Sequence, residues 1–150
     1  MNLKAKLQED LKQAMKSADA NSVGVLRMLI SAFNNKTIDK KGRGQGEDLT
    51  DEEATQTLMT EAKKRRESID VFTKGGRADL AEKEKAELEI VQRYLPKQMS
   101  KEEVEKIVSD IVSKAASKEI GPVMKAVMAE LRGKADSAMV SDLVKKAISN

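Results

Sequence analysis

The sequence contains no cysteine and no histidine, and each absence removes a class of function. Without cysteine there is no disulfide, no thiolate nucleophile and no cysteine-ligated metal. Without histidine the chain lacks the commonest general base and the commonest transition-metal ligand. We therefore expect no catalytic residue, no metal site and no cofactor in this chain. A reducing compartment is the default, and we expect it to be the cytoplasm.

Aromatic residues and long apolar runs are also scarce. Aromatic side chains make up 2% of the residues, so the core must be built from leucine, isoleucine, valine, alanine and methionine. The same scarcity leaves no platform on which single-stranded bases would stack. No apolar run approaches the length needed to span a bilayer, so we expect no membrane partner. The net charge of +3 permits a polyanionic partner but does not require one.

The sequence is rich in apolar residues at helical spacing. No segment shows a convincing alternation of apolar and polar residues, the pattern of a β-strand. The first 95 residues predict about four helices. Thr50 and Glu53 form a capping box that opens the third of them. The three glycines within residues 40–48 predict a mobile loop before it. Gly75-Gly76 separates the third helix from the fourth, and we expect these two to form an antiparallel hairpin.

The last third of the chain predicts a separate three-helix bundle. Leu95-Pro96 ends the fourth helix, because the residue before a proline is steered away from the helical region. Three short segments follow, each with a single apolar stripe, and Pro122 and Gly133 bracket the middle one. The sequence therefore predicts an all-α chain with an N-terminal helical domain, residues 1–95, and a C-terminal three-helix domain, residues 96–150.

Charged residues lie on apolar faces of the predicted hairpin. At about 100° per residue, Arg65 falls among the apolar residues of its helix. On the next helix Glu84 lies within the apolar stripe and Glu87 at its edge. An isolated charge on a packed face is costly, so we predict that Arg65 forms a salt bridge with Glu84 or Glu87. The alternative is a polar binding or catalytic site, but nothing nearby supplies a nucleophile, a base or a phosphate cradle.

Basic residues in the last third of the chain are candidates for contact with nucleic acid. They are Lys125, Arg132, Lys134, Lys145 and Lys146. The turn between the last two helices could place Arg132 and Lys134 beside the backbone amides that open the last helix, a geometry suited to phosphate oxygens. The alternative is a solvated basic face. Contact with the phosphate backbone of a folded RNA is the form of nucleic-acid binding that remains once base stacking is set aside, and we expect no DNA partner.

Two long stretches of the sequence resemble a known family. The runs "KKRRESIDVFTKGGRADLAEKEKAELEIVQRYLPKQMSKEE" and "GPVMKAVMAELRGKADSAMVSDLVKKAI" are similar to the YqeY (GatB/YqeY-domain) family of small bacterial proteins. The resemblance covers essentially the whole chain. This family is in turn similar to the C-terminal tail of the B subunit of glutamyl/aspartyl-tRNA amidotransferase, which helps to engage tRNA. The resemblance therefore implies a helical module whose partner is tRNA or a tRNA-processing, amidotransferase-like complex.

The resemblance to that tail carries over to few residues. They are Gly121, Lys125, Gly133, Lys134, Ala135, Asp136, Val140 and Leu143. Gly133 is expected to end a helix, Asp136 to cap the next one, and Val140 and Leu143 to lie in the core, which leaves Lys125 and Lys134 as functional candidates.

Three functions follow from these observations. We favour a non-catalytic module associated with tRNA or another RNA. The alternative is a protein–protein interaction module with no nucleic-acid role. The resemblance also implies a carbon–nitrogen ligase that takes its amide nitrogen from glutamine. This is the least favoured, because the chain has no counterpart of the ATP- and metal-using core or of the glutaminase site.

Overall fold

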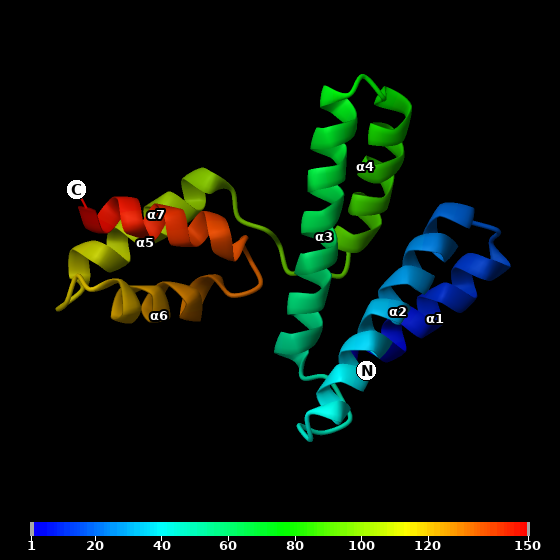
Figure 1. The fold of residues 1–150 in the computed structure, drawn as a ribbon, viewed down its shortest axis with the longest axis horizontal. Helices are drawn as coiled ribbons and strands as arrows, with labels where there is room; N and C mark the ends of the chain where they lie inside the picture. Colours follow the sequence, from blue (N-terminus) through cyan, green and yellow to red (C-terminus); the bar gives the residue numbers. More distant parts are fainter. Residues whose placement is uncertain (1, 150) are drawn as a thin grey trace. The chain divides into compact units, whose positions relative to one another are not determined.

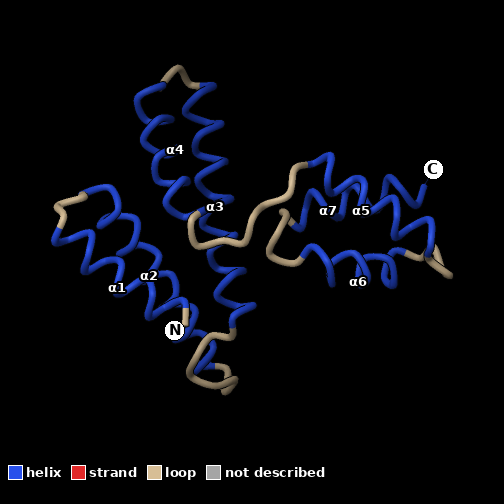
Figure 2. Tube along the Cα trace, turned by 180° about the vertical axis from the view of Figure 1, so that it is seen from behind, coloured by secondary structure: helices blue, strands red, loops and turns tan. Residues whose placement is uncertain are grey.

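The computed structural model describes residues 2–149, and these fold into seven α-helices with no strand among them. The helices are α1 (Leu3–Lys16), α2 (Ala20–Gly42), α3 (Asp51–Lys74), α4 (Ala78–Gln92), α5 (Lys101–Lys114), α6 (Ile120–Leu131) and α7 (Ser137–Ser149). The prediction of an all-α chain is confirmed. The chain divides into two compact units, Met1–Leu95 with α1 to α4 and Pro96–Asn150 with α5 to α7 (Figure 1, Figure 2).

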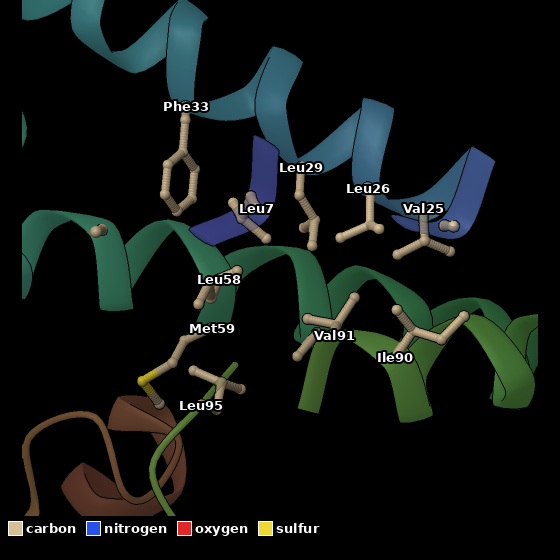
Figure 3. Close-up of a cluster of buried hydrophobic side chains, with 13 residues drawn as sticks. Leu7, Val25, Leu26, Leu29, Phe33, Leu58, Met59, Ile90, Val91 and Leu95 are labelled. Atoms are coloured by element: carbon tan, nitrogen blue, oxygen red, sulfur yellow. The ribbon is translucent and has the colours of Figure 1, made fainter. Parts of the chain in front are cut away.

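The first unit is built from two helical hairpins, α1 with α2 and α3 with α4 (Figure 1). Gly76 lies in the turn of the second hairpin with φ +72°, a backbone conformation that favours glycine. Side chains of α2, among them Leu29 and Phe33, point toward Leu58 of α3 and Val91 of α4 (Figure 3). All four are almost completely buried. The core between the hairpins is therefore mostly aliphatic, as the scarcity of aromatic residues requires.

The loop between the hairpins is shorter than the sequence predicts. Helix α2 continues to Gly42, so the first residues of the segment 40–48 are helical. The ammonium group of Lys40 donates to the carbonyl oxygen of Asp48 at 2.8 Å and lies 2.7 Å from Oε2 of Glu53. These contacts join the end of α2 to the start of α3, and the helix ends within the glycine segment, where Gly44 has φ +69°.

The start of α3 has the capping box that the sequence predicts. The hydroxyl of Thr50 accepts from the amide of Glu53 at 3.1 Å, and Oε2 of Glu53 accepts from the amide of Thr50 at 2.7 Å. Hydrogen bonds from Lys40 and then from the Thr50 amide hold the pKa of the Glu53 carboxyl below its usual value. The same carboxylate thus caps α3 and closes the preceding loop.

The second unit is a small three-helix bundle with a valine-rich core. Each helix contributes fully buried side chains, for example Val108 from α5, Val127 and Leu131 from α6, and Val144 from α7. Helix α6 begins at Ile120, two residues before the proline that was expected to open it. A proline is tolerated there because the first four amides of a helix have no acceptor within the helix.

Helix α1 is joined to the segment that follows α4 by the chain's single tyrosine. The hydroxyl of Tyr94 donates to Oδ2 of Asp10 at 2.5 Å, and the ammonium group of Lys6 lies 3.2 Å from the same oxygen. The hydrogen bond from Tyr94, with a smaller contribution from Lys6, holds the pKa of Asp10 below its ordinary value. Burial and the hydrogen bond to Asp10 raise the pKa of Tyr94 well above its ordinary value.

Replacing Tyr94 with phenylalanine should lower the free energy of unfolding of the first unit by about 1 kcal/mol at neutral pH, since one hydrogen bond is lost. The difference from wild type should shrink at both ends of the pH scale. The lowered pKa of Asp10 means that its contribution is lost as the pH falls below about 4. The raised pKa of Tyr94 means that its contribution is lost as the pH rises above about 10. Urea unfolding followed by circular dichroism, from below pH 4 to above pH 10, measures the free energy of unfolding of both proteins. A difference between wild type and Tyr94→Phe that does not change with pH would contradict the prediction.

Candidate nucleic-acid interface

The turn between α6 and α7 has a defined geometry that its sequence explains. Arg132, with φ −58° and ψ 125°, and Gly133, with φ +79°, occupy the two central positions of a type II turn. The amide of Lys134 donates to the carbonyl oxygen of Leu131 at 2.9 Å and closes the turn. The second central position requires a positive φ, so Gly133 is the residue that allows the chain to reverse here.

Two contacts from the segment before α5 fix this turn. The side-chain amide of Gln98 donates to the carbonyl oxygen of Gly133 at 2.8 Å. The backbone amide of Met99 donates to the carbonyl oxygen of Lys134 at the same distance. Gly133 is buried, whereas the side chains of Arg132 and Lys134 are exposed. The turn therefore directs two carbonyl oxygens toward its own chain and two cationic side chains toward solvent.

The start of α7 carries the aspartate that the sequence predicts as its cap. Oδ1 of Asp136 accepts from the amide of Ala138 at 3.4 Å, so a carboxylate of the chain itself lies at the opening turn of this helix. Its negative charge disfavours a second anion at the same place. The expectation that Asp136 caps α7 agrees with this hydrogen bond, and the expectation that Arg132 and Lys134 lie beside the amides that begin α7 stays a prediction. A phosphate would meet their side chains on the outside of the turn.

The other basic candidates lie on the outer faces of two helices. Lys125 is on α6, and Lys145 and Lys146 are adjacent near the end of α7, and all three are exposed. Within residues 2–149 none of these three, nor Lys134, forms an ion pair. The structure thus brings Arg132 and Lys134 together on one turn, while the remaining lysines extend the basic character along α6 and α7.

Arg65, the charge predicted to lie on an apolar face, is 8% exposed. Its Nη1 lies 3.4 Å from Oε2 of Glu61, and its Nε lies 3.8 Å from Oε2 of Glu87. Its Nη2 also contacts the sulfur of Met28 on α2. Of the two carboxylates named in the sequence analysis, Glu87 lies at ion-pair distance, and no ion pair between Arg65 and Glu84 is found in the part of the chain described.

Glu61 was missed by the sequence analysis. It precedes Arg65 by four residues on α3, a spacing at which helix side chains meet, so this signal was available. It is 7% exposed and lies 3.2 Å from the ammonium group of Lys64 as well as near Arg65. Nε of Arg65 is buried and donates no hydrogen bond. This cluster joins α2, α3 and α4 inside the first unit, which is the arrangement expected of a structural ion pair.

Two further features of the described residues bear on function. Among residues 2–149 there is no group of three or more histidine, cysteine, aspartate or glutamate residues that could hold a metal ion. None of the helices described is long and apolar enough to cross a membrane.

Comparison with known proteins gives a family match and several fungal relatives. The model of the family described as "Yqey-like protein" matches residues 4–148. A protein of Lachancea thermotolerans is 41% identical over 92 residues, which is 61% of this chain and 46% of that protein. One from Kluyveromyces lactis is 32% identical over 130 residues, covering 85% and 68% of the two chains. One from Pyrenophora tritici-repentis is 28% identical over 149 residues, covering 95% and 79%.

All three relatives carry the name "Altered inheritance of mitochondria protein 41, mitochondrial". The matched region spans about half the length of the Lachancea protein.

Proposed function

The chain belongs to the YqeY-like family, and from this premise we propose that it is a non-catalytic helical module that binds the sugar–phosphate backbone of a folded RNA, with tRNA as the first candidate. The resemblance of residues 121–148 to the tRNA-engaging tail of the amidotransferase B subunit supports the choice of RNA. The observation that carries the proposal is the fixed turn at Arg132 to Lys134.

A fixed turn suits phosphate binding because it lowers the entropy lost on association. The hydrogen bonds from Gln98 and Met99 hold the backbone of the turn before any ligand arrives. Arg132 offers a planar fork of donors that can bind two phosphate oxygens, and Lys134 offers a compact charge two residues away. Because Asp136 occupies the start of α7, we place the phosphate against these side chains rather than on helix amides.

The proposal is tested by the salt dependence of tRNA binding. Replacing both Arg132 and Lys134 with glutamine should weaken binding about tenfold. It should also reduce the slope of log affinity against log salt by about 2, because each phosphate contact that is lost leaves about one counterion bound to the RNA. Fluorescence anisotropy with labelled tRNA at several salt concentrations measures both quantities. The matched control replaces Lys101 and Lys106 of α5, also exposed, with glutamine.

Two results would contradict the proposal. One is no binding by wild type at low salt. The other is an equal loss of affinity in the control pair, which would mean that only net charge matters. Formation of amide from glutamine by the purified chain would overturn the non-catalytic part alone. The fungal relatives are named mitochondrial, and since both mitochondria and cytoplasm contain tRNA, the proposal holds for either compartment.

A further inference from the structure

The second unit has a surface groove between α5 and α6 that the RNA proposal does not use (Figure 2 shows the two helices). Its apolar lining consists of Ile107 and Ile111 on α5, Ala115 directly after α5, and Ala126 on α6. Its charged lining consists of Asp110, Lys114 and Glu130. The two alanines leave the groove open at their positions because each side chain is a single methyl group.

The apolar stripe of α5 has a buried row and a half-buried row. Val104, Val108 and Val112 form the row that is buried in the core. Ile107, Ile111 and Ala115 form a second row with the same spacing of four residues, and these side chains pack against the edge of the core but remain partly exposed. Both rows belong to the one apolar stripe of this helix, but the row of Ile107, Ile111 and Ala115 is only half-buried and lines the groove, so part of its apolar surface can be covered by another molecule.

Charged side chains lie beside this row. Asp110 and Lys114 are four residues apart on α5, the spacing at which an intrahelical ion pair forms. Nevertheless, neither of them nor Glu130 takes part in an ion pair within residues 2–149. A partner in the groove would therefore meet the negative charge of Asp110 and the positive charge of Lys114 along α5. It would also meet the negative charge of Glu130 on α6.

We propose that the partner is a second copy of this chain, bound through antiparallel packing of the two α5 helices about a two-fold axis near Ile111. A two-fold interface must be complementary to itself. With the axis at Ile111, the two copies of this residue meet. Ile107 then lies opposite Ala115 of the other copy, so that a large side chain fills the space left by a small one.

The same axis pairs the charges. Asp110 of each copy faces Lys114 of the other, with an axial offset of two residues or about 3 Å, which the long lysine side chain spans. Both ion pairs form at once because the symmetry repeats them. A wholly acidic or wholly basic helix in the groove would match only one of the two charges on α5, whereas an antiparallel copy of α5 matches both.

Charge exchange between the two positions tests this pairing. Asp110→Lys alone and Lys114→Asp alone each give a surface of one sign, and each should weaken dimerisation about tenfold or more relative to wild type. An equimolar mixture of the two variants should dimerise again, since each supplies the charge that the other lacks. The double variant Asp110→Lys/Lys114→Asp should also dimerise. Sedimentation equilibrium over a wide range of protein concentrations measures each case.

Controls separate this interface from effects on the fold. Glu105→Lys makes the same change of charge on another flank of α5 and should leave the dimer unchanged. Ile111→Asp should abolish it, because this residue lies on the axis. Circular dichroism should show the same helix content for the charge variants, because Asp110, Lys114 and Glu105 are exposed, and it checks that Ile111→Asp, at a residue that packs against the core, still folds. A wild type that stays monomeric at every concentration, or a mixture of the two charge variants that fails to restore the dimer, overturns the proposal.

Discussion

Replacing Arg65 with methionine is expected to lower the free energy of unfolding of the first unit by about 3 kcal/mol, because removing one member of a buried ion pair leaves the others uncompensated. Methionine has a long unbranched side chain that fills much of the same space, so the loss comes mainly from charge rather than from a cavity. Glu61 would keep Lys64 as a partner, but Glu87 would lose the guanidinium beside it. Urea unfolding followed by circular dichroism measures the change.

The matched control for this prediction is Glu84→Gln. Glu84 is a neighbour of Glu87 on α4 and was an equal candidate from the sequence, yet it does not pair with Arg65 in the structure. Its replacement should change the free energy of unfolding by less than about 0.5 kcal/mol. Adding Glu61→Gln to Arg65→Met should recover part of the loss, since the buried carboxylate is neutralised together with its cation. Equal effects of Arg65→Met and Glu84→Gln would show that the cluster is not structural.

Replacing Leu131 with alanine is expected to lower the free energy of unfolding of the second unit by about 3 kcal/mol and to leave the first unit unaffected. Leu131 is completely buried, so the substitution removes packed atoms and leaves a cavity. Its carbonyl oxygen also accepts the hydrogen bond that closes the turn before Lys134. Because Arg132 and Lys134 belong to the second unit, the same variant should weaken tRNA binding at temperatures where this unit begins to unfold.

The scarcity of aromatic residues makes the two units separable by spectroscopy. The single tyrosine and both phenylalanines lie in residues 1–95, so tyrosine fluorescence reports on the first unit alone. Circular dichroism reports on the helices of both units. For Leu131→Ala, circular dichroism should show an early transition that the fluorescence of Tyr94 lacks.

The matched control in the other unit is Leu58→Ala, which truncates a completely buried side chain of the first unit. It should shift the fluorescence transition to lower urea. If Leu131→Ala shifts fluorescence and circular dichroism together, residues 1–95 and 96–150 unfold as one cooperative unit, and their description as separate domains fails.

Much of the fold was open to prediction because the signals are local. Apolar residues at helical spacing, the capping pair Thr50 and Glu53, and the glycines at the hairpin turn each act within a few residues of chain. The same kind of reasoning placed Arg65 on an inward face, because periodicity determines which side of a helix a residue occupies. In the candidate interface, Gly133 was recognisable as the residue that ends α6, and Asp136 as the residue that caps α7.

By itself, then, the sequence determined the all-α class, the approximate extent of most helices and which side chains face inward. Only the tertiary structure decided which residues meet across helices. Asp10 and Tyr94 are 84 residues apart, and Gln98 and Gly133 are 35 apart, yet each pair is joined by a hydrogen bond. Periodicity gives the face of a helix but not its rotation and axial position against a neighbour. For that reason Glu87 rather than Glu84 lies beside Arg65.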